Sequence, residues 1–158
     1  METIPITEAK ARIAELADRV AREHDHFTIT RNGRADVMLI SVAEYESMQE
    51  TLDILSDEET LADLRQSRED FAAGDTFSRQ ARRNLHENLP LDVAVAAMET
   101  IDGPLTTNPH RAGKPLEEPF DGYHSARRGT YRIIYRINED KHTVEIHSVR
   151  HRREAYRT

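Results

Sequence analysis

The amino-acid sequence predicts an α+β protein built from two units with an acidic helical segment between them. Three observations carry this prediction. The 158 residues suffice for one domain or two small ones. Hydrophobic patterning reads as β-α-β-β-α in the first half and as helices followed by strands in the second. The halves also have opposite charge, with a net of −10 over residues 1–78 and +3 over residues 79–158.

The first half begins with a short strand and an amphipathic helix. Residues 3–6 alternate like a strand, and a helix starts at Thr7. Its apolar residues recur at helical spacing; they are Ala9, Ile13, Leu16, Ala17 and Val20. Two strand-like runs, 27–30 and 35–40, then flank Asn32-Gly33, and Asn-Gly is the strongest short signal for a hairpin.

Two acidic helices are expected next. A Ser followed three residues later by Glu, the spacing of a capping box, occurs at Ser41 and again at Ser56, which predicts helices over 42–55 and 57–73. From residue 41 to 78 there are 11 acidic residues and two arginines. A solvated helical face is the ordinary interpretation of such a run. Because a basic module follows, the run could instead cover a phosphate-binding surface as a tethered competitor.

The second half predicts two helices and then an antiparallel sheet. The helices span about 78–87 and 91–102, and Gly103-Pro104 ends the second one. A polar loop rich in turn signals follows, and strands are expected over 131–137 and 142–149.

Arginines interleave with tyrosines from residue 123 to 156, which suits a surface that holds phosphates and stacks bases. A solvated strand face with buried tyrosines explains the same composition, and composition alone does not separate the two. Within the strand 131–137, Arg132, Ile134 and Arg136 share one face, which we expect to be exposed to solvent.

Several classes of protein are excluded or disfavoured. The absence of cysteine excludes disulfides, thiolate metal sites and a thiol nucleophile. No apolar run is long enough to span a membrane, and the N-terminus has no secretory signal, so we expect a cytoplasmic protein with no membrane contact. The histidines 124, 142, 147 and 151 lack the spacing of a zinc hydrolase, and Gly113-Lys114 is not a P-loop, so neither a metal nor another cofactor is expected. A single histidine that transfers protons near neutral pH is a more plausible role for these residues than metal binding.

A weaker cationic set lies in the first half. Its four cations are Lys10, Arg12, Arg31 and Arg34, at the start of the first helix and at the hairpin tip, and the neutral Asn32 of the hairpin is grouped with them as an expected DNA contact. Two associated copies would repeat this patch by symmetry, which is how small dimers read palindromic DNA.

The first half resembles the Phd/YefM family of antitoxins, of the RelB type. The resemblance rests on three segments: 6–13 (ITEAKARI), 28–34 (TITRNGR) and 39–45 (LISVAEY). It implies an operator-binding dimerisation domain over residues 1–50, with the cationic set above contacting DNA. It also implies that the acidic arm and linker, residues 51–78, neutralise a toxin.

The second half, residues 79–158, resembles toxins of the RelE/ParE superfamily, of the RelE type. The segments are 103–105 (GPL), 108–111 (NPHR), 113–116 (GKPL), 125–132 (SARRGTYR) and 151–157 (HRREAYR). The resemblance implies a RelE-like antiparallel sheet with two helices and a ribosome-dependent, metal-independent mRNA endoribonuclease. Antitoxin and toxin follow one another in a single chain, which also explains the charge split.

The resemblance implies a catalytic set as well. Arg132 matches the strand arginine that binds phosphate, Arg152 the arginine of the last stretch, and Tyr156 the C-terminal tyrosine. The lysine positions of the family fall on His124 and Ala126, and His124 could serve as general base. Arg127, Arg128, His151 and Arg153 are candidate phosphate-binding residues. The first strand of RelE-type toxins has only the short, polar residues 74–78 as its counterpart.

Three functions therefore stay open on the sequence. The first is a toxin-antitoxin fusion in which the arm masks the nuclease. The second is a DNA-binding transcriptional autoregulator whose toxin half is catalytically inert, and the third is a ParE-like gyrase inhibitor. Expected partners are a second copy through the N-terminal module, operator DNA, and mRNA on the ribosome.

Overall fold

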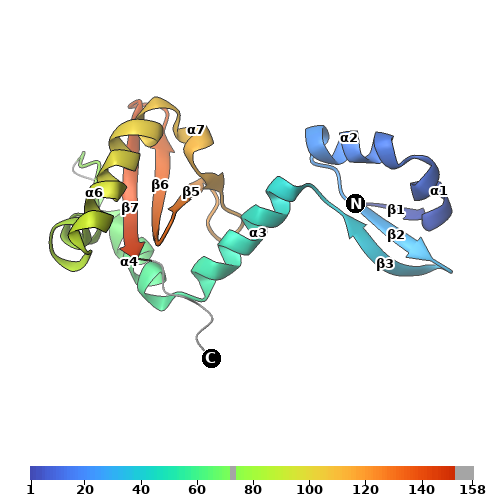
Figure 1. Ribbon diagram of the computed structural model, residues 1–158, viewed down its shortest axis with the longest axis horizontal. Coiled ribbons are helices and arrows are strands. Elements are labelled where there is room, and N and C mark those ends of the chain that lie inside the picture. The colour runs from blue at the N-terminus through green and yellow to red at the C-terminus, as the bar shows by residue number, and fades with distance from the viewer. Residues whose placement is uncertain (72–73, 152–158) are drawn as a thin grey trace. The chain divides into compact units, whose positions relative to one another are not determined.

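The computed structural model describes residues 1–71 and 74–151, and they divide into two compact units, Met1–Glu46 and Ser47–Thr158 (Figure 1). Each unit has its own sheet and its own hydrophobic core. Within the described residues, no helix combines the length and the apolar character needed to cross a membrane.

The first unit is a three-stranded sheet covered by two helices. β1 (Glu2–Pro5) pairs in parallel with β2 (Phe27–Arg31), which pairs antiparallel with β3 (Arg34–Leu39). Between β1 and β2 lie α1 (Ile6–Ala11) and α2 (Ile13–Glu23). The core consists of Ile4, Ala9, Leu16, Val20, Phe27 and Ile29.

The single helix expected from Thr7 is two helices, because the backbone leaves helical geometry at Arg12 (φ −116°, ψ 16°). Of the expected apolar stripe, Ala9, Leu16 and Val20 are buried, whereas Ile13 and Ala17 are exposed. The hairpin prediction is confirmed. Asn32 and Gly33 both have positive φ, 51° and 74°, as a two-residue hairpin turn with the twist of the strands requires.

The acidic segment forms α3 (Val42–Leu55) and α4 (Glu58–Asp70). Ser41 caps the first helix by accepting a hydrogen bond from the Glu44 amide at 3.1 Å. The cap of the second helix is Asp57 rather than Ser56, since the Asp57 carboxylate accepts from the amides of Glu59 and Thr60. A carboxylate suits the positive end of a helix at least as well as a hydroxyl does.

The second unit contains a four-stranded antiparallel sheet in the order β4-β5-β6-β7, as expected for a RelE-like fold. The strands are β4 (Lys114–Pro115), β5 (Tyr123–Arg128), β6 (Tyr131–Asn138) and β7 (Thr143–His151).

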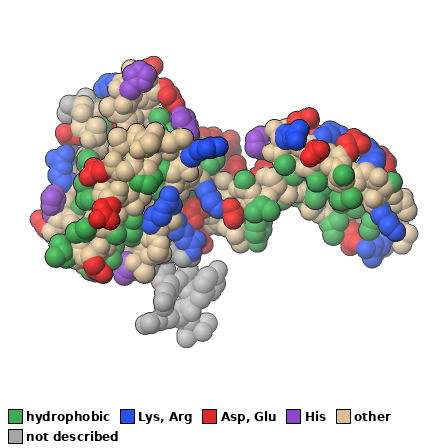
Figure 2. Space-filling model, turned by 45° about the horizontal axis from the view of Figure 1, so that its top comes forward, with side chains coloured by type: hydrophobic (Ala, Val, Ile, Leu, Met, Phe, Trp, Pro, Cys, Tyr) green, Lys and Arg blue, Asp and Glu red, His purple; other side chains and the backbone are tan. Residues whose placement is uncertain are grey.

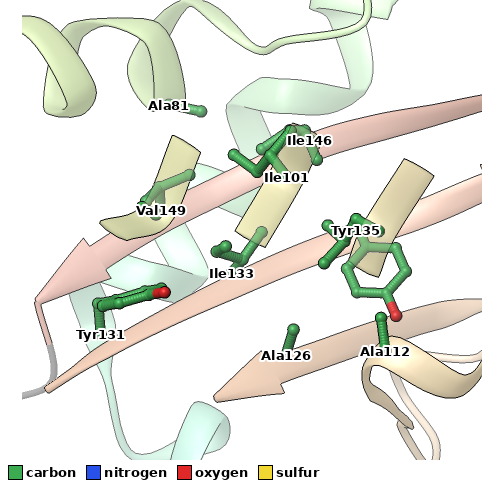
Figure 3. Close-up of a cluster of buried hydrophobic side chains, with 11 residues drawn as sticks. Ala81, Ile101, Ala112, Ala126, Tyr131, Ile133, Tyr135, Ile146 and Val149 are labelled. Atoms are coloured by element: carbon green, nitrogen blue, oxygen red, sulfur yellow. The ribbon is translucent and has the colours of Figure 1, made fainter. Parts of the chain in front are cut away.

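Short helices cover one face of this sheet. They are α5 (Arg79–Arg83), a π-helical turn η2 (Asn84–Asn88), α6 (Leu91–Thr100), a second π-helical turn η3 (Ile101–Leu105) and α7 (Pro109–Ala112). Their apolar residues pack on Ile133, Tyr135, Ile146 and Val149, as Figure 3 shows. Gly103-Pro104 does not end the helix as expected, because η3 continues it to Leu105.

The acidic helices cover the opposite face of the same sheet. Ile54 of α3 and Leu64 of α4 join Ile134 in a second cluster of buried apolar residues. The expectation that the Arg132-Ile134-Arg136 face is exposed to solvent is therefore wrong for its first two members. Ile134 is fully buried and Arg132 is 6% exposed, whereas Arg136 remains exposed.

Residues 74–78 stand where RelE-type toxins are expected to have their first strand. In this segment Phe77 forms an isolated parallel bridge with Ile146 of β7. The Ser78 amide donates to the Ile146 carbonyl at 2.9 Å, and the Ile146 amide donates to the Thr76 carbonyl at 2.8 Å. No segment of α3 or α4 adds a strand at this edge of the sheet, because both are helical and pack on its face.

Candidate RNA-binding face and the acidic arm that covers it

Three arginines form a row across the face of the sheet that α3 and α4 cover. Arg127 of β5 lies directly opposite Arg132 of β6, and Arg132 lies directly opposite Arg150 of β7. Cross-strand neighbours project to the same face, and like charges placed opposite one another repel. Anions placed over such a row relieve this repulsion and accept hydrogen bonds from the guanidinium groups, so the row is a candidate phosphate-binding surface.

α3 supplies the anions at one end of the row. Arg132 Nε donates to Glu50 Oε1 at 2.6 Å, and the side chains of both residues are 7% exposed. Ser125 Oγ donates to the same carboxylate oxygen at 2.6 Å. Asp53 lies 3.5 Å from Arg132 and 4.0 Å from Arg127, and Arg127 is also 3.7 Å from Glu50.

α4 holds the other end of the row. Arg150 binds Asp63 through two hydrogen bonds, Nε to Oδ2 at 2.6 Å and a terminal nitrogen to Oδ1 at 2.7 Å. Ser148 Oγ donates to Asp63 at 2.8 Å, and Glu59 makes a more exposed contact with Arg150 at 3.1 Å. The hydrogen bonds to Asp63 raise the pKa of the Arg150 guanidinium, although burial opposes this.

His147 lies next to this row and is sealed by the arm. Ile134 pairs with Ser148 and Tyr135 with Ile146, so His147 is an extra residue in β7, a β-bulge. The bulge turns His147 and Ser148 to the same face. His147 Nδ1 is 2.6 Å from Ser67 Oγ of α4, and burial, followed by the charges of Arg136 and Arg68, lowers the imidazole pKa to about 3.

The structure brings together only part of the expected catalytic set. Arg132 and Arg127 lie side by side, but His124 belongs to the opposite face of the sheet, because neighbouring strand residues alternate. It stacks on Tyr135 with ring centroids 5.4 Å apart, and burial, followed by the charge of His110, lowers its pKa. His124 and Arg132 therefore cannot reach the same phosphate in this geometry.

The remaining phosphate-binding candidates are dispersed. Arg128 donates to the carbonyls of Arg127 and Ala112, on the side of the sheet that carries His124. His151 is exposed at the end of β7. Arg152, Arg153 and Tyr156 lie outside the described residues.

Sequence reasoning missed Arg150, Ser148 and the role of His147. The register that places Arg150 opposite Arg132 depends on the bulge in β7. The predicted strand ended at residue 149, whereas β7 continues to His151.

The five expected DNA contacts are on α1, at its end or on the β2–β3 hairpin. Lys10 and Arg34 are exposed, and Asn32 is in the turn. Arg31 lies 3.3 Å from Asp36. Arg12 is bound by Glu15 and Glu8, whose hydrogen bonds raise its pKa, so its charge is already compensated within the unit.

No group of three or more histidines, aspartates and glutamates is placed to hold a metal ion within residues 1–71 and 74–151.

Comparison with known families finds a different family in each half of the chain. Residues 1–74 match the family of Phd_YefM antitoxins of type II toxin-antitoxin systems, and residues 76–156 match the ParE toxins of the type II system parDE. The chain belongs to the type II toxin-antitoxin proteins, to the Phd/YefM antitoxin family in its first half and to the ParE/RelE toxin family in its second. Antitoxin and toxin are thus joined in one polypeptide.

Relatives from Mycobacterium tuberculosis match each half separately. The toxin RelE is 48% identical over 77 residues, which is 49% of this chain and 78% of the relative. The antitoxin RelB is 33% identical over 84 residues, 53% of this chain and 94% of the relative. A chain of the toxin-antitoxin complex RelBE2 is 47% identical, covering 48% of this chain and 93% of that one, with a TM-score of 0.46.

Proposed function

We propose that the second unit carries a ribosome-dependent, metal-independent mRNA endoribonuclease and that the arm of the same chain neutralises it by occupying its phosphate-binding arginines. One observation carries this proposal. The row Arg127-Arg132-Arg150 lies on one face of the sheet, and the carboxylates of Glu50, Asp53 and Asp63 are bound to it where RNA phosphates would bind. Tethering gives the arm an effective concentration on the order of millimolar, which favours occupancy even by a weak contact.

We propose that the functions are assigned to segments of the chain nearly as the sequence predicts. Residues 79–158 are the toxin domain, and residues 1–50 include the DNA-binding dimerisation domain. The arm is best started at Ser47 rather than at residue 51, because Glu50 already contacts Arg132.

In the cleavage step, the 2′-hydroxyl of the RNA gives up its proton to a base and attacks the neighbouring phosphate, which forms a 2′,3′-cyclic phosphate. The P–O5′ bond breaks at the same time, and the 5′-oxygen takes up a proton and leaves as a hydroxyl. Charge accumulates on the phosphate oxygens, and guanidinium groups aligned on a rigid sheet stabilise that charge. Arg132 and Arg150 supply these groups only after Glu50 and Asp63 have left them. Arg152 and Tyr156 remain candidates for completing the site.

The proposal is tested by primer extension on translated mRNA with the full chain. We expect position-specific cuts with the double variant Glu50→Gln, Asp63→Asn, in which the arm is weakened, and no cuts when Arg132→Ala is added to it. Glu58→Gln is the matched control, since it removes an acid of α4 that is exposed. Absence of cuts in the double variant, with the arginine face shown to be accessible, would contradict a nuclease.

We also propose that the first unit forms a homodimer that binds operator DNA. Large apolar side chains are exposed on this unit, as the green areas on the smaller unit in Figure 2 show, and four of them are Val37, Met38, Val42 and Tyr45. A second copy would bury them and repeat the hairpin arginines by symmetry. Gel-shift titrations at several salt concentrations test this. Lys10→Ala or Arg31→Ala should each lower the number of counterions released on DNA binding by about one, which makes the affinity less dependent on salt. Binding without any sequence preference would argue against an operator.

A further inference from the structure

His147 has surroundings that fit only a neutral imidazole. It lies between Phe71, with ring centroids 4.4 Å apart, and Tyr123, at 4.9 Å. Ser67 Oγ donates to the Leu64 carbonyl at 3.1 Å, so its oxygen accepts from His147 Nδ1–H. The lone pair is then on Nε2, which is buried without a hydrogen-bond partner.

The charged groups around His147 oppose a second proton. Arg136 of β6 and Arg68 of α4 are the nearby cations, and Asp70 at the end of α4 is the facing carboxylate. Asp70 is already bound to Arg79 at 2.8 Å. Tyr123 of β5 contributes a buried hydroxyl that itself has no hydrogen-bond partner. An imidazolium here would be a buried cation beside two arginines, and the facing carboxylate is already bound to Arg79, which makes the charged form strongly unfavourable.

We propose that protonation of His147 lifts α4 from the arginine face, so that the hold of the arm on the toxin sheet is acid-labile. This inference rests on the proposal that the arm is the neutralising element. Once α4 leaves, Ser67 and Phe71 no longer cover the imidazole, and water can solvate both of its nitrogens. The uncovered state therefore binds the proton in preference to the covered state, and acid favours uncovering by linkage.

The pH dependence of α4 opening follows from the difference in the pKa of His147 between the covered and the uncovered state. The pKa of His147 is about 3 under the arm and returns toward its usual value of about 6.5 in water. A histidine whose pKa is lowered in the closed state favours closure above pH 6.5 and loses that contribution as the pH falls. Between pH 7.5 and pH 5.5 the opening constant should rise about tenfold. Carboxylates with ordinary pKa values titrate below this window.

Hydrogen-deuterium exchange of the full chain tests the proposal. Protection of the α4 amides, corrected for intrinsic exchange rates, is measured at pH 7.5 and pH 5.5. We expect about a tenfold loss of protection in the wild type and less than a twofold loss in His147→Gln, which keeps a donor for Ser67. His124→Gln is the matched control, because His124 is a partly buried histidine on the opposite face, and it should behave like the wild type.

Unchanged protection in the wild type, or an equal loss of protection in His147→Gln, would overturn the proposal. Should that variant fail to fold, NMR of the wild-type imidazole gives the answer. A His147 that titrates near pH 6.5 while α4 stays protected would show that the proton binds without lifting the arm. These measurements do not depend on RNA cleavage, so failure of this inference and failure of the nuclease proposal are separate outcomes.

Discussion

Asp63 is 2% exposed and binds Arg150 through both carboxylate oxygens, so Asp63→Asn tests how strongly the arm is held. The substitution removes the charge but nearly preserves the shape, and it leaves the Arg150 guanidinium under the arm without its main counterion. Breaking a buried ion pair in this way costs about 3–5 kcal/mol. The Arg150 side chain is 23% exposed, which places the expected cost near the lower limit, about 3 kcal/mol, or more than a hundredfold in the opening constant.

Glu59 supplies a matched comparison on the same guanidinium. It contacts Arg150 at 3.1 Å, but its side chain is 48% exposed, and exposed ion pairs contribute about 1 kcal/mol or less. Glu59→Gln should therefore increase opening no more than about fivefold. Hydrogen exchange of α4 in the full chain at pH 7.5 measures both variants. Equal effects of the two substitutions would refute the claim that Asp63 is the principal anchor.

The remaining predictions concern the toxin sheet. Burial raises the pKa of Tyr135 to about 12, so the stability that its protonated form contributes should be lost as the pH rises from about 10 to 12. Denaturation curves of Tyr135→Phe should then show a flatter alkaline branch than those of the wild type, and parallel branches would count against this. A Cβ at Gly113 would lie 2.7 Å from the Ser125 carbonyl oxygen and 2.8 Å from the Tyr135 hydroxyl, so Gly113→Ala should destabilise by about 1–3 kcal/mol in urea titrations. Gly103→Ala, which meets no atom within 4 Å, is the control, and equal midpoints would contradict the steric argument.

Local signals predicted much of the fold. Asn32-Gly33 predicted the hairpin, and Ser41 with Glu44 predicted a helix whose limits, Val42–Leu55, match those of α3. These features depend on backbone preferences and on contacts within a few residues, which a sequence displays directly. The break at Arg12 and the continuation through Gly103-Pro104 depend on packing and were not predicted.

The site was harder to predict because it depends on register. The strand arginine Arg132 was found from the sequence, but its neighbour Arg150 becomes visible only when the bulge at His147 fixes the pairing of β7. Side chains alternate along β5, so His124 and Arg127 lie on opposite faces of the sheet. Which of these two faces the arm covers becomes known only from the structure. The complementary charge of the two halves predicted a covered basic surface, whereas the alternation of residues along the strand 131–137 predicted that the same surface is exposed to solvent.

The central claim is that the arm keeps RNA away from the row Arg127-Arg132-Arg150. Fluorescence anisotropy with a short labelled single-stranded RNA tests it on the full chain, comparing the wild type with Glu50→Gln, Asp63→Asn. The double variant should bind RNA at least tenfold more tightly and with a steeper salt dependence, because freed arginines then release counterions from phosphate. The same affinity and the same salt dependence in both proteins would contradict the claim.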